Sequence, residues 1–175
     1  MKMKTKSIML SVLIALVFMV GTVFSSSGQV SATASTTATI IAPISISKIV
    51  DVNFGNIAVS SIAGTVVLSP TSAGTRASTG GITLPIVTGV VTAAKFTVTG
   101  EGTSTYGITL PASVNIAYGG QTMVVNNFTS TPSQTGALSN GTQDIYLGAT
   151  LNVNGNQLPG TYTNASDLLI TVNYN

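Results

Sequence analysis

Few side chains in this sequence could do acid–base chemistry. The part that follows the apolar N-terminus holds four carboxylates, Asp51, Glu101, Asp144 and Asp167. The chain has no histidine and no cysteine, and therefore lacks the commonest general base, the thiol nucleophile and most zinc and copper ligands. A glycosidase-type pair would have to come from the four acids. Each lies beside an expected turn or strand end, where a solvated acid is ordinary.

The spacing of these acids also argues against a metal centre. Calcium loops place several oxygen ligands within a short stretch of chain, and no closely spaced cluster of aspartates occurs in this sequence. The glycine pairs are not followed by an expected helix, so they do not form a phosphate-binding loop. We therefore expect a protein that is not an enzyme and that binds neither a cofactor nor a metal.

The charge of the chain is small once its N-terminus is set apart. The formal charge of +2 includes three lysines within the first ten residues. The remainder has three basic and four acidic side chains, which gives a charge of −1. Nucleic-acid binding requires clustered Lys and Arg, which three isolated basic residues cannot supply. Nucleic acid is therefore not an expected partner.

The N-terminus has the three parts of a secretion signal. Lys2, Lys4 and Lys6 precede an apolar stretch at residues 8–24, and small residues follow at 25–34. We expect cleavage after Ala32, with Ser27 and Ala34 as the alternative positions. Polar and small residues interrupt the apolar run, and no basic residue follows it before Lys48. The sequence thus predicts a helical signal peptide at residues 1–32 and a secreted protein without a membrane span after cleavage.

Alternation of apolar and polar residues dominates the rest of the chain, and no amphipathic helix is predicted. Gly- and Asn-rich turns separate the alternating runs. Eight or nine short strands of this kind indicate an all-β, immunoglobulin-like antiparallel sandwich, with a small barrel as the alternative. Beyond the first segment, the expected strands are residues 64–68, 81–87, 94–99, 106–110, 113–118, 123–128, 144–153 and 167–174.

The first alternating segment after the signal has one apolar face. Pro43 cannot donate a hydrogen bond to a neighbouring strand, which predicts a sheet edge or a bulge at this point. We assign residues 33–48 to this N-terminal strand and residues 49–175 to the sandwich domain. The apolar face consists of Ala38, Ile40, Ala42, Ile44 and Ile46.

The two ends of the mature chain carry a resemblance to known families. Residues 160–175 resemble the end of chaperone–usher pilins, in which a glycine precedes a penultimate tyrosine by fourteen residues. Residues 38–46, followed by Asn53-Phe54-Gly55, resemble secreted proteins of the spore-coat-U type, and the chain is similar to the bacterial family called domain of unknown function 4402. The matching C-terminal residues are Gly160, Leu168, Ile170, Val172 and Tyr174.

The resemblance implies an immunoglobulin-like fold and a role on the bacterial cell surface or in the periplasm, without an enzymatic activity. A pilin lacks one strand, and the N-terminal extension of the next subunit supplies it by β-strand addition. Residues 37–46 have the alternation of such a donor, and burial of three isoleucines would contribute roughly 4 to 9 kcal/mol before entropic costs. The implied partners are further copies, related surface subunits and a periplasmic chaperone.

Two interpretations of residues 37–46 remain open at this point. Spore-coat-U-type pilins usually carry a disulfide, which this chain lacks, and the segment could instead be the first strand of its own sandwich. The leading hypothesis is a structural subunit of a fibre or coat. The alternative is a monomeric adhesin or glycan-binding module, whose contact surfaces would be the polar connections at residues 100–105 and 130–141.

Overall fold

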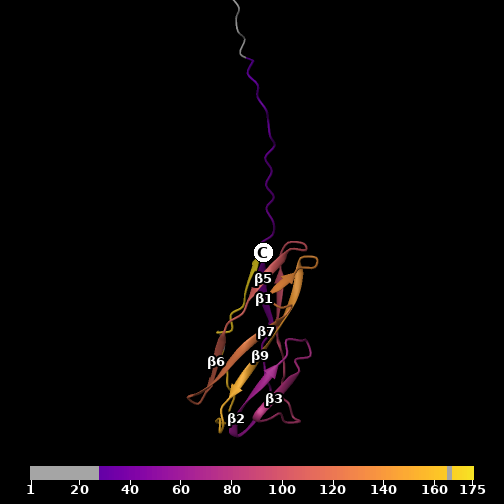
Figure 1. Ribbon diagram of the computed structural model, residues 1–175. Helices are drawn as coiled ribbons and strands as arrows, with labels where there is room; N and C mark the ends of the chain where they lie inside the picture. Colours follow the sequence, from indigo (N-terminus) through magenta and orange to yellow (C-terminus); the bar gives the residue numbers. More distant parts are fainter. Residues whose placement is uncertain (1–27, 165–166) are drawn as a thin grey trace, which may run out of the picture. The chain divides into compact units, whose positions relative to one another are not determined.

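The structure is a computed structural model that describes residues 28–164 and 167–175 (Figure 1). Residues 1–27 of the expected signal peptide lie outside the described residues. Residues 28–39 are exposed and form neither helix nor strand, whereas Ile40–Asn175 form a compact domain. The described part of the chain contains no helix that is long and apolar enough to cross a membrane.

Ten β-strands make up the described part of the domain, and every pairing between them is antiparallel. Seven of them form one sheet, and β5, β8 and β10 form a second. The strands are β1 (Ser45–Val50), β2 (Ala58–Leu68), β3 (Arg76–Thr83), β4 (Ala94–Thr99), β5 (Thr105–Thr109), β6 (Ser113–Tyr118), β7 (Gln121–Thr131), β8 (Thr135–Ala137), β9 (Thr142–Val153) and β10 (Thr171–Tyr174).

Strand β9 is the centre of the large sheet. Its first half pairs with β4 and its second half with β2, while β7 flanks it on the other edge. Apolar residues alternate along β9, so one of its faces is buried throughout. The buried residues are Ile145, Leu147, Ala149, Leu151 and Val153, as the alternation predicts.

The core lies between the two sheets. One cluster gathers Phe96 and Ile145 of the large sheet with Tyr106 and Val172 of the small sheet, which makes the domain a sandwich. A second cluster lies under β2, β7 and β9. Figure 1 shows the C-terminus at the same end of the domain as β1 and β5, with β2 and β3 at the opposite end. The predicted all-β antiparallel sandwich is confirmed.

Several predicted strand boundaries are wrong. β1 begins only at Ser45, and residues 37–44 form no strand. β3 ends at Thr83 instead of Val87, since Pro85 follows and the Ile86 side chain is fully exposed. β10 begins at Thr171 instead of Asp167, and the three-residue strand β8 was not predicted. β4 and β6 have the predicted boundaries.

Candidate assembly site

The structure divides the five apolar residues of the predicted donor segment. Ala38 belongs to the exposed residues 28–39. Within the domain, the Ile40 side chain is 98% exposed and Ala42 is exposed as well. Ile44 and Ile46 are half-buried and pack against the core between the two sheets. The apolar alternation therefore begins on exposed residues, and the domain buries it only from Ile44 onward.

Strand β1 holds the buried end of this segment. It pairs with β4 alone and is therefore an edge strand of the large sheet. The register places Ser45 opposite Thr99, and their side-chain oxygens are 2.7 Å apart. Because Ile46 faces the core from this strand, the donor segment can be free only before Ile44.

Strand β10 presents the second edge. Its predicted inward residues are buried at Ile170 and Val172 and half-buried at Leu168 and Tyr174. Among the described residues β10 pairs only with β5, so its other edge, which we call the open edge, has no hydrogen-bonded strand, although β10 also contacts β1.

The direction of the β10 amides follows from the pairing. The Asn175 N–H donates to Thr105 O at 3.3 Å, which continues the register of Tyr174 opposite Tyr106. Alternate residues of an antiparallel strand direct their backbone groups to opposite edges. The N–H groups of Val172 and Tyr174 therefore point to the open edge of β10.

A cluster of three hydrogen bonds joins the chain before β1 to the C-terminal residues of the domain, and we call it the Ala42 clamp. The Tyr174 hydroxyl donates to Ala42 O at 2.9 Å and accepts from the Glu101 N–H at 2.7 Å. The Ala42 N–H donates to the Glu101 carboxylate at 3.1 Å. The clamp thus engages both backbone groups of Ala42. Sequence analysis named Ala42, Glu101 and Tyr174 separately but did not predict that they meet.

Gly100 allows Tyr174 to reach this position. A Cβ at residue 100 would lie 2.3 Å from the Tyr174 hydroxyl oxygen, so the tyrosine rests directly on the backbone. The Gly100 N–H donates to Gly141 O at 2.9 Å. The two polar connections at residues 100–105 and 130–141 consequently lie side by side, and β8 forms within the second of them. The first of these connections contacts Tyr174 through Gly100 and Glu101.

Gly160 lies against a different tyrosine. A Cβ at residue 160 would be 2.0 Å from the Tyr118 ring, which packs edge-on against Tyr162 with ring centroids 5.7 Å apart. The Gln157 amide donates to the Tyr162 hydroxyl at 2.9 Å, and this hydroxyl donates to Leu158 O at 2.8 Å. The structure thus gives Gly160 a packing role beside β6.

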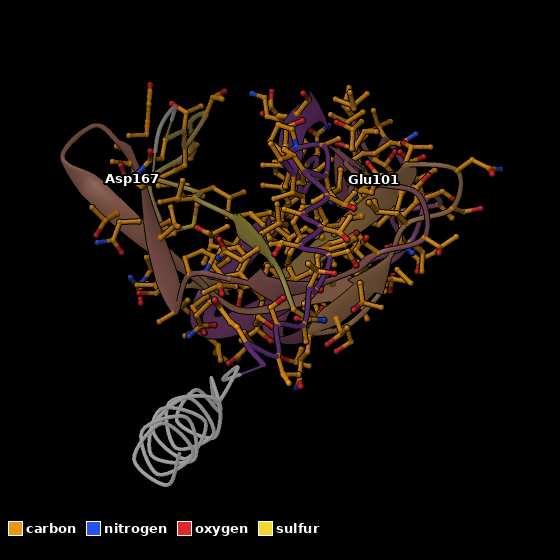
Figure 2. The ribbon with its side chains drawn as sticks, turned by 90° about the horizontal axis from the view of Figure 1, so that it is seen from above. Glu101 and Asp167 are labelled. Carbon is orange, nitrogen blue, oxygen red and sulfur yellow. The ribbon has the colours of Figure 1, made fainter. Side chains whose placement is uncertain are left out.

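The four carboxylates do not gather into one site. Asp51 contacts Lys48 at 2.6 Å, and Asp144 contacts Lys95 at 2.8 Å. Figure 2 shows Glu101 and Asp167 apart, on opposite sides of the view. The Asn164 amide donates to the Asp167 carboxylate at 2.7 Å. Across residues 28–164 and 167–175, no three potential metal ligands lie together.

The ion pair between Lys95 and Asp144 lies on the outer face of the large sheet. Hydrogen bonds from Lys95 and Thr97 lower the pKa of Asp144, and the same contact with Asp144 raises the pKa of Lys95. Both groups reach solvent, so this pair contributes little to stability. Its geometry is that of a surface pair between β4 and β9 and offers no acid–base arrangement.

Arg76 has a structural role that sequence analysis missed. Its guanidinium donates to Phe54 O, to Asn56 O at 2.8 Å and to Thr88 O at 3.4 Å. Gly55 has a φ of +68°, and a Cβ there would lie 2.3 Å from Thr88 O and 3.0 Å from the guanidinium. The Asn53-Phe54-Gly55 motif therefore makes room for an arginine that ties two loops together.

Comparison with known families agrees with this architecture. The family model described as Domain of unknown function (DUF4402) matches residues 44–174. The chain belongs to this family. The match runs from the residue before β1 to the end of β10, so it covers both edge strands and leaves residues 33–43 outside. No curated protein and no solved structure gives a significant match.

Proposed function

We propose that this DUF4402 protein is an exported, non-catalytic structural subunit of a cell-surface fibre or coat, and that its subunits join by β-strand addition. The observation that carries the proposal is the exposure of Ile40 and Ile41, at 98% and 50%. Both isoleucines lie in a stretch without secondary structure, directly before the point at which the same alternation enters the core. Exposed isoleucines in an extended stretch suit a segment that is buried elsewhere.

The open edge of β10 supplies a matching acceptor. An added strand would receive hydrogen bonds from the N–H groups of Val172 and Tyr174, and its alternate side chains would reach the core between the sheets. Burial of one isoleucine such as Ile40 contributes about 1.5 to 3 kcal/mol. Pairing of the backbone adds to this free energy, so that a short donor could hold two subunits together.

Signal cleavage during export would place the donor at the N-terminus of the mature chain. The expected cleavage after Ala32 leaves residues 33–41 as the start of the mature chain. The proposed location is the cell surface or the periplasm, and the proposed partners are further copies of this chain or related surface subunits. A periplasmic chaperone that covers the β10 edge before assembly is consistent with the same scheme.

The test compares two substitutions of exposed isoleucines. Ile40→Asp places a charge in the proposed donor, whereas Ile86→Asp places the same charge at a fully exposed loop residue outside it. We expect the wild type and Ile86→Asp to form polymers by electron microscopy and light scattering, and Ile40→Asp to remain monomeric. Polymers of Ile40→Asp equal to those of the wild type would refute the donor role.

A deletion that tests the donor must end before β1, because β1 belongs to the domain. Removal of residues 33–41 takes away the proposed donor but keeps Ile44, Ile46 and the pairing of β1 with β4. A longer deletion that enters β1 would also damage the domain.

A wild-type chain that is monomeric at every concentration and binds a glycan would instead favour the monomeric binding module.

A further inference from the structure

We infer that the Ala42 clamp prevents the chain from filling its own acceptor edge and so directs the donor to a second copy. This inference rests on the proposed function. It assigns the side chains of Tyr174 and Glu101 a positioning role: they would act on the donor through Ala42, whereas the backbone of Tyr174 belongs to the acceptor edge.

β1 begins and β10 ends at the same end of the domain, so the two strands run in opposite directions. β1 starts at Ser45, opposite Thr99 and next to the Gly100 backbone that Tyr174 touches. β10 ends at Tyr174. Figure 1 shows the C-terminus and the β1 label at this same end. A donor that filled its own acceptor edge would therefore run beside β10 toward Tyr174 and then turn sharply into β1.

That turn would have to form at Ala42 and Pro43. Ile44 already packs against the core, and Ser45 is already paired in β1. In a β-turn, the carbonyl of the first residue accepts from the N–H three residues later, which here means Ala42 O and the Ser45 N–H. Proline suits the second position of such a turn. The sequence alone would permit the chain to fold back.

The clamp engages one of the two groups that this turn needs, Ala42 O, and holds the Ala42 N–H as well. Ala42 O accepts from the Tyr174 hydroxyl, and the Ala42 N–H donates to Glu101. Tyr174 is itself fixed, because it rests on Gly100 and accepts from the Glu101 N–H. Folding back would sacrifice these hydrogen bonds, each of which contributes to stability. A second copy can fill the β10 edge without disturbing the clamp of the acceptor.

The experiment uses the full chain purified after export and removes the clamp hydroxyl with Tyr174→Phe. Tyr162→Phe is the matched control, because it removes a hydroxyl that donates to Leu158 O instead. Sedimentation gives the ratio of monomer to polymer, and hydrogen exchange gives the protection of residues 33–41 in the monomer. We expect Tyr174→Phe to raise the ratio of monomer to polymer roughly tenfold, which corresponds to the loss of one or two hydrogen bonds. The same substitution should slow the exchange of residues 33–41 in the monomer.

Tyr162→Phe should keep the wild-type ratio and an unprotected segment. Glu101→Ala releases the Ala42 N–H by another route and should shift the ratio in the same direction as Tyr174→Phe. Variants that polymerise like the wild type and leave residues 33–41 unprotected would overturn the clamp while leaving the proposed function intact. A wild-type chain that never polymerises would overturn both, so the two failures are distinguishable.

Discussion

Substitution of Gly160 by alanine should destabilise the domain through a clash with the Tyr118 ring. The added Cβ would lie 2.0 Å from one Tyr118 ring atom and 2.1 Å from another. The ring packs against Tyr162, but Tyr118 is 44% exposed, so the ring can yield toward solvent. Overpacking of a closed core costs about 1 to 3 kcal/mol, and at this half-exposed position we expect the lower end, about 1 kcal/mol. We expect Gly160→Ala to lower the free energy of unfolding by that amount.

Gly107→Ala is the matched control. Gly107 lies in β5, and its new Cβ would meet the nearest atom only at 3.4 Å, which is ordinary van der Waals contact. Replacing glycine by alanine where the backbone permits it stabilises a protein by about 0.4 to 1 kcal/mol. We therefore expect the two glycine substitutions to have opposite signs in urea unfolding followed by circular dichroism.

A double-mutant cycle identifies the clash as the cause. Tyr118→Ala removes the ring, so Gly160→Ala should cost less than about 0.5 kcal/mol in that background. The coupling between the two substitutions would then account for most of the loss. If Gly160→Ala costs as much with Ala at residue 118 as with Tyr, the contact with Tyr118 does not explain the glycine, and our reasoning about this position is wrong.

Two further predictions concern the loop contact of Arg76 and the buried side chain of Tyr106. Arg76→Met leaves the carbonyls of Phe54, Asn56 and Thr88 without their shared donor, and should lower the free energy of unfolding by about 1.5 to 3 kcal/mol in urea titrations; an unchanged midpoint would contradict the role of Arg76. Burial raises the pKa of Tyr106 above 10.0, so the unfolded chain releases this proton at lower pH than the folded chain. The contribution of Tyr106 to stability should be constant below pH 10 and decline as the pH rises beyond it, and Tyr106→Phe should remove this part of the decline in thermal unfolding.

Alternation predicted strands β4, β6 and β9 well because burial of one face imposes it there. β4, β6 and the inward face of β9 agree with the sequence pattern, since each packs one face on the core. The same pattern predicted a strand from residue 37, whereas β1 begins at Ser45 and the domain does not bury the alternation before Ile44. Alternation signals a face that can be buried, and it does not specify which chain buries that face.

Other features depend on contacts that no local pattern contains. β8 has only three residues and pairs with β5, and backbone hydrogen bonds from Leu138 to Ser104 and from Ile108 to Gln134 continue this pairing on either side. Arg76 reaches carbonyls more than ten residues away in either direction along the chain. The Ala42 clamp joins residues 132 positions apart. Tyr174 could be singled out by resemblance, but its partners become visible only in three dimensions.

The most direct test of strand addition is the hydrogen exchange of two backbone amides in β10. The N–H groups of Val172 and Tyr174 point to the open edge, whereas the Asn175 N–H donates to Thr105 O in the small sheet. In the monomer, we expect fast exchange at Val172 and Tyr174. In the polymer, their exchange should slow at least roughly 100-fold, which corresponds to about 2.7 kcal/mol of opening free energy. Polymers in which both amides still exchange at the monomer rate would contradict the account.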